Sequence, residues 1–225
     1  MKLNRRKFIT TGTSLALGLG VVAAFNYDNS PNASKMPGVS VAKAADANVE
    51  KLHAAPKIGD RFLGKADAPI TIVEYASATC PHCADFHAGT FVQIKKDYID
   101  TGKVRYIFRE FPFDDLALAA FMLARCAPEE KYFPMLDVIF KQHQVWTRNP
   151  RDELLKIAKL AGFTEETFGK CLKNEDVAKG ISAIRDTGNK EFGINSTPTF
   201  FVNGKQLAGN QPIEKFKELI DAASK

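Results

Sequence analysis

The spacing of hydrophobic and polar residues changes along the chain, which predicts a mixed α/β protein. Residues 69–76 are mostly apolar and β-branched, the composition of a buried strand, and residues 104–108 have the same character. Between them, residues 80–98 are predicted to form one helix whose apolar face contains Phe86, Phe91 and Ile94. Strand, helix and strand in this order predict a right-handed βαβ unit.

A long helical region follows, and strands return only near the end of the chain. Residues 114–191 have a helical pattern, in which Asn149-Pro150 begins one helix. Residues 199–202 and 205–208 are predicted strands joined by an Asn203-Gly204 hairpin turn, and residues 213–223 form an amphipathic helix. The fold class is therefore α/β, with the element order of a thioredoxin fold that carries an inserted all-helical subdomain. Its predicted parts are residues 58–113, 114–191 and 192–225.

Residues 1–44 are predicted to be an export signal followed by a spacer. A basic head containing Arg5-Arg6 precedes an apolar run from about 12 to 25, which is too short for a comfortable membrane span. The head resembles a twin-arginine signal, although adjacent arginines also occur in general secretory signals. Residues 42–44 and 22–24 are the candidate cleavage sites. The predicted location is the periplasm, with membrane anchoring as the alternative if neither site is cut.

Charge gives no reason to expect nucleic-acid binding. The 225 residues carry a formal net charge of +5, but six of the 31 Lys and Arg residues and only one of the 26 Asp and Glu residues lie in the first 44 positions. The remaining chain is therefore formally neutral, and it offers no excess of positive charge to a polyanion.

The candidate chemistry lies in Cys80-Pro81-His82-Cys83, at the junction of a predicted strand and helix. Two cysteines three positions apart lie within one helical turn, and the free N–H groups at a helix N-terminus stabilise a thiolate. We expect Cys80 to be the exposed nucleophile and Cys83 to resolve the mixed disulfide. Pro81 holds the turn, and His82 is expected to bring its ring near the Cys80 sulfur. Each unit by which the Cys80 pKa falls below 7 stabilises the thiolate by about 1.4 kcal/mol at neutral pH.

Together with Thr-Ile-Val-Glu-Tyr-Ala-Ser before it, and Ser-Thr-Pro-Thr-Phe-Phe-Val-Asn-Gly at 196–204, this motif closely resembles the DsbA-like thiol–disulfide oxidoreductases of bacterial envelopes. The resemblance covers about residues 58–223. It implies that Pro198 is a cis-proline that packs against the active-site disulfide and offers backbone groups to substrate, with Thr197 as the variable residue before it. It also implies that Glu74 is a buried acid that takes part in proton transfer when Cys83 attacks. A purely structural acid is the alternative for Glu74.

Two positions depart from the best-known oxidases of this family. His87 stands where some relatives carry an acid. Thr197 replaces an apolar residue and also occurs in isomerase-type relatives. These departures leave the direction of the exchange open between oxidation and isomerisation.

The predicted function is the introduction of disulfide bonds into reduced or unfolded exported proteins by dithiol–disulfide exchange. The resemblance implies reoxidation by a membrane quinone-linked partner, with the Cys80–Cys83 disulfide in place of a cofactor. A disulfide isomerase or reductase is the first alternative, although the stretch between Ala45 and Pro69 is short for the separate dimerisation domain that isomerases usually have. A chaperone or a metal-holding protein, with Cys80, Cys83 and His82 or His87 as ligands, is the other alternative.

The remaining cysteines, Cys126 and Cys171, both lie in the helical region. In an exported protein they most simply form a structural disulfide, which contributes up to about 4 kcal/mol in the chain-entropy model. Some DsbA-like proteins have such a second bridge, and two free buried thiols are the alternative. His53 and His143 have no visible partners in the sequence, so both are expected at the surface.

Overall fold

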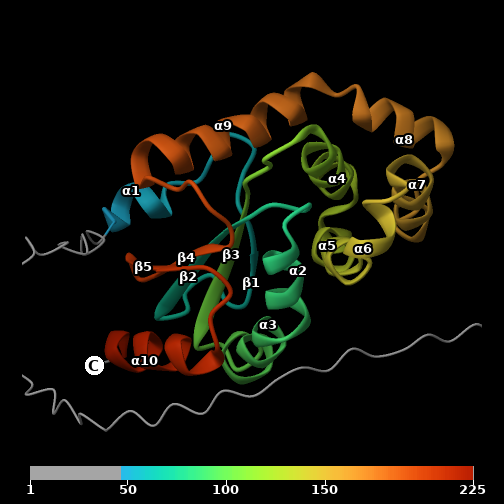
Figure 1. The fold of residues 1–225 in the computed structure, drawn as a ribbon. Helices are drawn as coiled ribbons and strands as arrows, with labels where there is room; N and C mark the ends of the chain where they lie inside the picture. Colours follow the sequence, from blue (N-terminus) through green and yellow to red (C-terminus); the bar gives the residue numbers. More distant parts are fainter. Residues whose placement is uncertain (1–46, 225) are drawn as a thin grey trace, which may run out of the picture. The chain divides into compact units, whose positions relative to one another are not determined.

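A five-stranded mixed sheet lies at the centre of residues 47–224, the part of the chain that the computed structural model describes (Figure 1). The strands are β1 (Arg61–Leu63), β2 (Ile70–Ala76), β3 (Val104–Glu110), β4 (Thr199–Val202) and β5 (Lys205–Ala208), in the spatial order β1-β3-β2-β4-β5. β2 and β3 are parallel, and the other neighbouring pairs are antiparallel. The predicted export signal lies outside the described residues.

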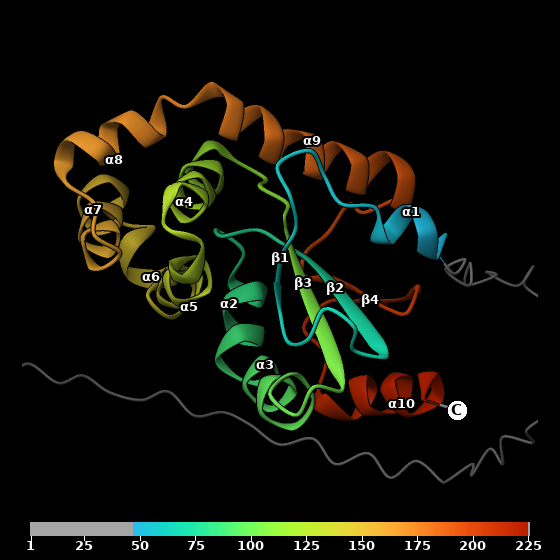
Figure 2. The same ribbon diagram turned by 180° about the vertical axis from the view of Figure 1, so that it is seen from behind.

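Helices cover both faces of the sheet, as Figures 1 and 2 show from opposite sides. The helices are α1 (Val49–His53), α2 (Pro81–Ala88), α3 (Thr90–Ile94), α4 (Asp115–Cys126), α5 (Tyr132–Lys141), α6 (His143–Trp146), α7 (Pro150–Leu160), α8 (Glu165–Leu172), α9 (Glu175–Phe192) and α10 (Ile213–Ala223), with a π-helical turn at Lys95–Ile99 and a 3₁₀ turn at Glu129–Lys131. None of these helices is long and apolar enough to cross a membrane.

The alternation of side chains along β2 decides which helices each residue meets. Ile72 packs in a cluster with Phe216 of α10 and Phe86 of α2. Val73 and Tyr75 point the other way, into a cluster that contains residues of α1 and α9. Both faces are therefore buried, which explains why β2 is apolar along almost its whole length.

The fold class predicted from the sequence is confirmed, and α4 to α9 occupy the predicted helical region. Trp146, Phe121 and Phe140 are among the large buried side chains that fill the core of this region. α7 begins at Pro150 as predicted. The side chain of Thr164 accepts a hydrogen bond from the backbone of Thr167 and so caps α8.

The β4–β5 hairpin and α10 occupy the residues that the pattern predicted. The turn residues Asn203 and Gly204 have φ angles of 44° and 88°. A two-residue hairpin turn requires such positive values, which asparagine and glycine tolerate best. The Asn203 side chain also accepts a hydrogen bond of 2.8 Å from the backbone of Thr71, which fixes the turn against β2.

The prediction of one continuous helix over residues 80–98 is wrong. α2 ends at Ala88 because Gly89 adopts φ −122° and ψ −90°, outside the helical region, and α3 begins at Thr90. Phe86 and Phe91 are five positions apart, which exceeds the three or four positions that place side chains on one helical face. The interruption at Gly89 lets both rings reach the same core, where their centroids are 6.2 Å apart.

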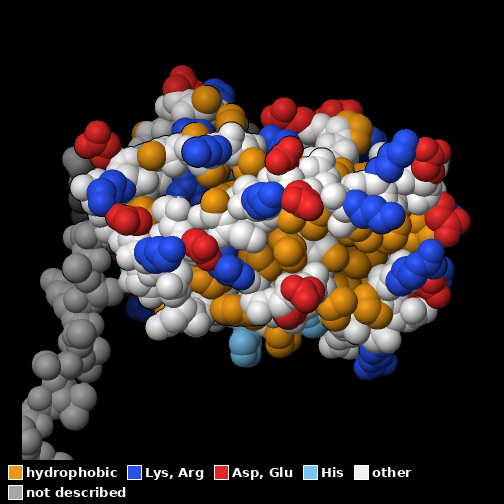
Figure 3. All heavy atoms as spheres, turned by 90° about the horizontal axis from the view of Figure 1, so that it is seen from above, with side chains coloured by type: hydrophobic (Ala, Val, Ile, Leu, Met, Phe, Trp, Pro, Cys, Tyr) orange, Lys and Arg blue, Asp and Glu red, His pale blue; other side chains and the backbone are white. Residues whose placement is uncertain are grey.

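Figure 3 views the molecule from above, onto the face that carries α9. Charged side chains of both signs are interspersed over this face, with hydrophobic side chains visible between them. This distribution matches the formal neutrality of residues 45–225, because neither sign forms a continuous region on this face.

Candidate active site

Cys80 lies where the loop after β2 enters α2. It is the N-cap residue in an extended conformation, and Pro81 is the first residue of the helix. Cys80 is partly exposed and Cys83 is fully buried, and both are unbridged thiols in this structure. The sequence motif therefore places one accessible sulfur at the helix N-terminus and a second sulfur one turn inward.

The two thiols differ strongly in acidity. A hydrogen bond from the Cys83 thiol is the largest cause that lowers the pKa of Cys80 to about 5. Burial opposes it, whereas the Thr197 side chain and the backbone N–H groups of Cys83 and His82 also lower this pKa. Burial raises the pKa of Cys83 well above its usual value, and its bond to Cys80 and the charge of Glu74 add to the effect. Cys80 is thus the thiolate at neutral pH, and Cys83 keeps its proton.

His82 acts on Cys80 through its backbone in this structure. Its side chain is exposed, and its ring makes no hydrogen bond with any residue in 47–224. The expected influence of the His82 ring on the Cys80 sulfur stays a prediction.

The second motif of the sequence meets the first at the Cys80 sulfur. The Cys80 sulfur lies 3.3 Å from the backbone carbonyl oxygen of Thr197, 117 positions away, and the protonated thiol can donate a hydrogen bond to it. The Thr197–Pro198 peptide bond is cis, and both residues are buried. The cis-proline segment and the cysteine pair therefore form one site.

Glu74 is completely buried beneath α2, on the same face of β2 as Ile72. Its Oε2 accepts a hydrogen bond from the Tyr106 hydroxyl of β3 and lies 3.0 Å from Nε2 of His87 in α2. Its Oε1 has no hydrogen-bond partner within residues 47–224. The structure thus brings three polar side chains from three elements together in an otherwise apolar region below Cys83.

The loop that carries Cys80 is held by residues of the helical region. The Thr79 hydroxyl donates to Asp114 at 2.7 Å, and His143 Nε2–H donates to the Thr79 carbonyl at 2.9 Å. The expectation of a surface His143 without a partner is wrong, because this ring is half-buried against the loop. The contact joins positions 64 apart, and no local pattern in the sequence reveals it.

The expectation of a surface His53 is also wrong. This ring is half-buried beside α1, and its Nε2 is buried without a hydrogen-bond partner in the described part of the chain. Burial, assisted by the charges of Arg105 and Arg109, lowers the pKa of His53 and favours the neutral ring.

Cys126 and Cys171 form a disulfide that joins the end of α4 to α8, with the Cα atoms 6.1 Å apart. The alternative of two free thiols is therefore not the state in this structure. Within residues 47–224, no group of three or more His, Cys, Asp or Glu side chains is arranged to hold a metal ion.

A thioredoxin family model matches residues 57–222, which is most of the chain. The chain belongs to the thioredoxin family. Solved structures of DsbA proteins resemble it over most of its described length. The crystal structure of Wolbachia pipientis alpha-DsbA1 is 32% identical, has a TM-score of 0.71, and the match covers 77% of this chain and 94% of that one. The structure of oxidised BdbD from Bacillus subtilis is 28% identical with a TM-score of 0.66, covering 76% and 96%.

Curated relatives place the chain in the same DsbA-like group. Disulfide bond formation protein D of Bacillus subtilis is 31% identical, and the match covers 72% of this chain and 76% of that protein. A candidate protein-disulfide oxidoreductase of Rickettsia bellii is 38% identical over 73% of this chain. The chain spans only 64% of the length of the Rickettsia bellii protein. The family resemblance inferred from the two motifs is confirmed.

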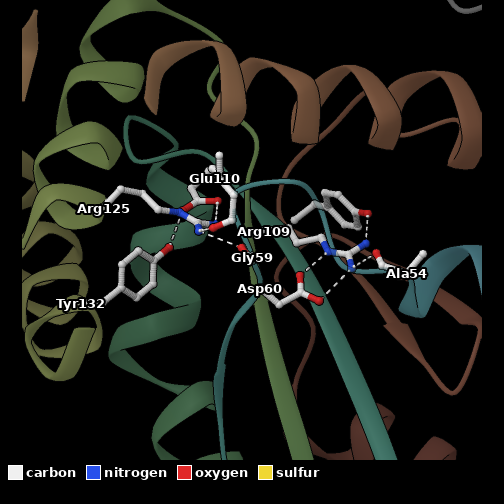
Figure 4. Close-up of polar contacts among 9 residues, drawn as sticks. Ala54, Gly59, Asp60, Arg109, Glu110, Arg125 and Tyr132 are labelled. Carbon is white, nitrogen blue, oxygen red and sulfur yellow. Dashed lines mark hydrogen bonds and ion pairs between the residues drawn. The ribbon is translucent and has the colours of Figure 1, made fainter. Parts of the chain in front are cut away.

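Two buried ion pairs brace this DsbA-like chain beside the site, and sequence reasoning missed both (Figure 4). Arg125 of α4 binds both carboxylate oxygens of Glu110, at 2.5 and 2.8 Å, and Tyr132 donates to the same carboxylate at 2.7 Å. Arg109 binds Asp60 at 3.1 Å, and its other donors reach the Tyr75 hydroxyl and a backbone carbonyl. The only signal in the sequence was the pair Arg109-Glu110 directly after an apolar strand.

Proposed function

We propose that this chain is a thiol–disulfide oxidoreductase that introduces disulfides into exported proteins in the periplasm, through Cys80 and Cys83. The observation that carries the proposal is the contrast in acidity between the two thiols. The pKa of Cys80 is lowered to about 5, whereas that of Cys83 is raised. A stabilised Cys80 thiolate stabilises the reduced pair, and this makes the corresponding disulfide a stronger oxidant.

The expected increase in the reduction potential of the Cys80–Cys83 pair is moderate, because Cys80 is partly exposed to solvent. Two pKa units below neutral pH correspond to roughly 60 mV for a two-electron couple, before any reduction by solvent screening. An increase of this order moves a reductase-like potential toward that of an oxidase, which favours oxidation as the direction of the exchange.

The proposed reaction starts from the Cys80–Cys83 disulfide. A substrate thiolate attacks the Cys80 sulfur, which forms a mixed disulfide and releases Cys83 as a thiolate that takes up a proton. The second thiolate of the substrate then attacks the substrate sulfur of the mixed disulfide. This forms the substrate disulfide and releases the Cys80 thiolate, so that the substrate loses two electrons and the enzyme gains them.

The role given to Cys83 in the sequence analysis needs one correction on chemical grounds. If Cys83 attacks the mixed disulfide, the enzyme disulfide forms again and the substrate leaves reduced. Release of an oxidised substrate therefore requires the second thiol of the substrate. Attack by Cys83 belongs to the reverse exchange and to reoxidation by a partner, for which a membrane quinone-linked protein is our proposal.

Pro198, Thr197 and Glu74 have supporting parts in this proposal. The Thr197 carbonyl oxygen lies only 3.3 Å from the Cys80 sulfur, so the cis-proline segment is close enough to bind the backbone of a substrate attached to that sulfur. Glu74 acts on Cys83, because its charge contributes to the raised pKa of that thiol. Export through the predicted signal, by the twin-arginine or the general route, would bring the chain to reduced substrates.

The experiment that tests the function is trapping with Cys83→Ala. In this variant the Cys80 thiolate can still attack disulfides of exported proteins, but no Cys83 is present to cleave the mixed disulfide that results, so mixed disulfides are expected to accumulate and can be identified by mass spectrometry. The matched control is Cys80→Ser in the same background, which should trap nothing. The reduction potential separates the directions, since a value near that of a cytosolic reductase contradicts the oxidase assignment and favours an isomerase or reductase.

A further inference from the structure

A cavity lies beside His87, the histidine that contacts the buried acid Glu74 of the candidate site. It has a volume of about 470 Å³ and lies between α3 and α5, beside α2 and β1. Its walls are mainly apolar, with Phe91, Val92 and Phe133 among them, and His87 is the one lining residue that also contacts Glu74. A cavity of this size holds several water molecules.

His87 is held in a fixed orientation between Glu74 and this cavity. Only 5% of the side chain is exposed, and the ring stacks on Phe140 with a centroid distance of 4.1 Å and an interplanar angle of 12°. Nε2 lies 3.0 Å from Glu74 Oε2. Within residues 47–224, no group hydrogen-bonds the other ring nitrogen, Nδ1. The imidazole therefore has one nitrogen committed to the acid and one that remains available to water.

We propose that His87 transfers protons between Glu74 and water in this cavity whenever Cys83 gains or loses its proton. The inference deepens the proposed function and rests on it. It gives the buried pair Glu74–Cys83 a proton route that does not pass through the side on which the substrate attaches to Cys80. Because His87 acts through Glu74, it is a positioning and proton-transfer residue and does not itself touch the reacting sulfurs.

The proton transfer balances in both directions. When substrate attack releases Cys83 as a thiolate, the Glu74 carboxyl gives it a proton and becomes a carboxylate. Neutral His87 then donates the proton on Nε2 to Glu74 Oε2 while Nδ1 takes up a proton from cavity water, so that the ring changes from the Nε2–H to the Nδ1–H tautomer. When Cys83 attacks a mixed disulfide, the same transfers run in reverse, and neutral His87 accepts the proton from Glu74.

The groups around His87 suit such a transfer. Glu74 of β2 and Tyr106 of β3 face it on the inner side, with Cys83 one turn before it in α2. On the cavity side, Lys141 pairs with Asp137 of α5 at 2.7 Å, and Lys95 pairs with Asp100 at the same distance. The charges lining the cavity are thus neutralised in pairs, and His87 remains the group that links the acid to water.

The test separates the two steps of one exchange in the full-length chain. Reduced protein is mixed with oxidised glutathione and quenched with acid, and mass spectrometry follows the Cys80–glutathione disulfide. Its formation depends on Cys80, whereas its disappearance requires Cys83 to lose a proton. We expect His87→Gln, which keeps a hydrogen bond to Glu74 but cannot gain charge, to slow the second step by about 10- to 100-fold and leave the first unchanged. His53→Gln, which changes a half-buried histidine on the opposite face of the sheet, is the control and should change neither step.

A second variant separates proton transfer from packing. In His87→Ala the cavity extends to Glu74, so added imidazole is expected to restore the second step in proportion to its unprotonated form. Pyrazole has a similar size but is far less basic and should restore nothing. Equal rescue by both compounds, or a wild-type second step in His87→Gln, overturns the proton route while leaving the proposed function intact. Failure of the wild-type chain to form the glutathione disulfide at all overturns both.

Discussion

The two cysteines of the site occupy different electrostatic environments although only two residues separate them. The backbone N–H groups of His82 and Cys83 and the Cys83 thiol all act on Cys80, whereas Cys83 is enclosed by apolar side chains and faces Glu74. The acidity of Cys80 therefore depends more on its buried partner than on the exposed ring between them.

This dependence predicts the behaviour of Cys83→Ala. The substitution removes the hydrogen bond that lowers the pKa of Cys80 most, so that pKa should rise above about 5. Thiolate absorbance or the rate of alkylation as a function of pH measures it. The control is His82→Ala, which keeps the backbone N–H and should shift the Cys80 pKa less. A larger shift in His82→Ala than in Cys83→Ala would contradict this account and restore the His82 ring as the main influence.

For individual residues, the sequence analysis predicted which side chains lie near the Cys80 sulfur, but not the orientation or the contacts of each one. The cysteine spacing pointed to the site from the residues alone, whereas only the resemblance to DsbA-like proteins placed Thr197 and Pro198 beside it, where the structure brings Thr197 within 3.3 Å of Cys80. The orientation of the His82 ring was not predictable, because nothing in the pattern constrains an exposed side chain. His143 was misjudged because its partner, the Thr79 carbonyl, is a backbone atom that any residue would supply.

At the scale of elements, buried ion pairs connect β3 to the segments around it. Glu110 at the end of β3 binds Arg125 of α4, and Arg125 also donates to the backbone carbonyls of Ile58 and Gly59. A single carboxylate thus helps to hold the sheet, the helical region and the chain before β1 together (Figure 4).

Glu110→Gln should lower the free energy of unfolding by about 3–5 kcal/mol, because it leaves the buried charge of Arg125 without its partner. Denaturant unfolding of oxidised protein measures the change. Asp137→Asn removes the carboxylate of an exposed pair and should have almost no effect. Equal losses in the two variants would show that the buried pair has no special role in stability.

The disulfide between α4 and α8 gives a second prediction at this scale. Replacing both Cys126 and Cys171 by alanine should cost about 2–4 kcal/mol of stability, because the unfolded chain gains freedom when a long loop opens. Denaturant unfolding again measures the loss, and the potential of the Cys80–Cys83 pair should stay as in the parent. A changed potential would mean that the bridge also acts on the active site.

Elements with strong local signals were predicted closely, and short or interrupted ones were not. The β4–β5 hairpin was predicted because Asn203-Gly204 is a turn signal within a few residues. β1 was missed because three residues are too few to show alternation, and it exists through its pairing with β3. The break at Gly89 was missed because the apolar residues continue on both sides of it.

For the whole molecule, the acidity of Cys80 predicts how stability depends on pH. The pKa of Cys80 falls from an ordinary 9.0 to about 5 in the folded reduced chain, so the unfolded chain binds more protons between these values. The stability of the reduced form relative to the oxidised form should therefore rise with pH through this range, and the contribution is lost as pH falls through about 5. The raised pKa of Cys83 affects the stability of the reduced form only in more alkaline solution, because this thiol stays protonated in both the folded and the unfolded chain at lower pH.

Denaturant unfolding of both redox forms, at several pH values on either side of 5, measures this difference. The oxidised form is the internal control, because it contains every other titrating group but neither of these thiols. Parallel pH dependences in the two forms would contradict a stabilised thiolate in the folded protein.

The single long helix α9 has a consequence for anyone who wishes to exchange modules between relatives. Its earlier turns pack against α4, and Ile181 belongs to the core of the helical region. Ile184 belongs to the core under the sheet, and Gly188 lies so close to the Tyr75 ring that a methyl group there would clash. A chimaera that transplants residues 114–174 alone would separate the donor's helices α4 to α8 from the α9 helix, against which α4 packs. Grafts that transfer α9 together with Tyr75, the β2 residue against which it packs, are expected to fold better.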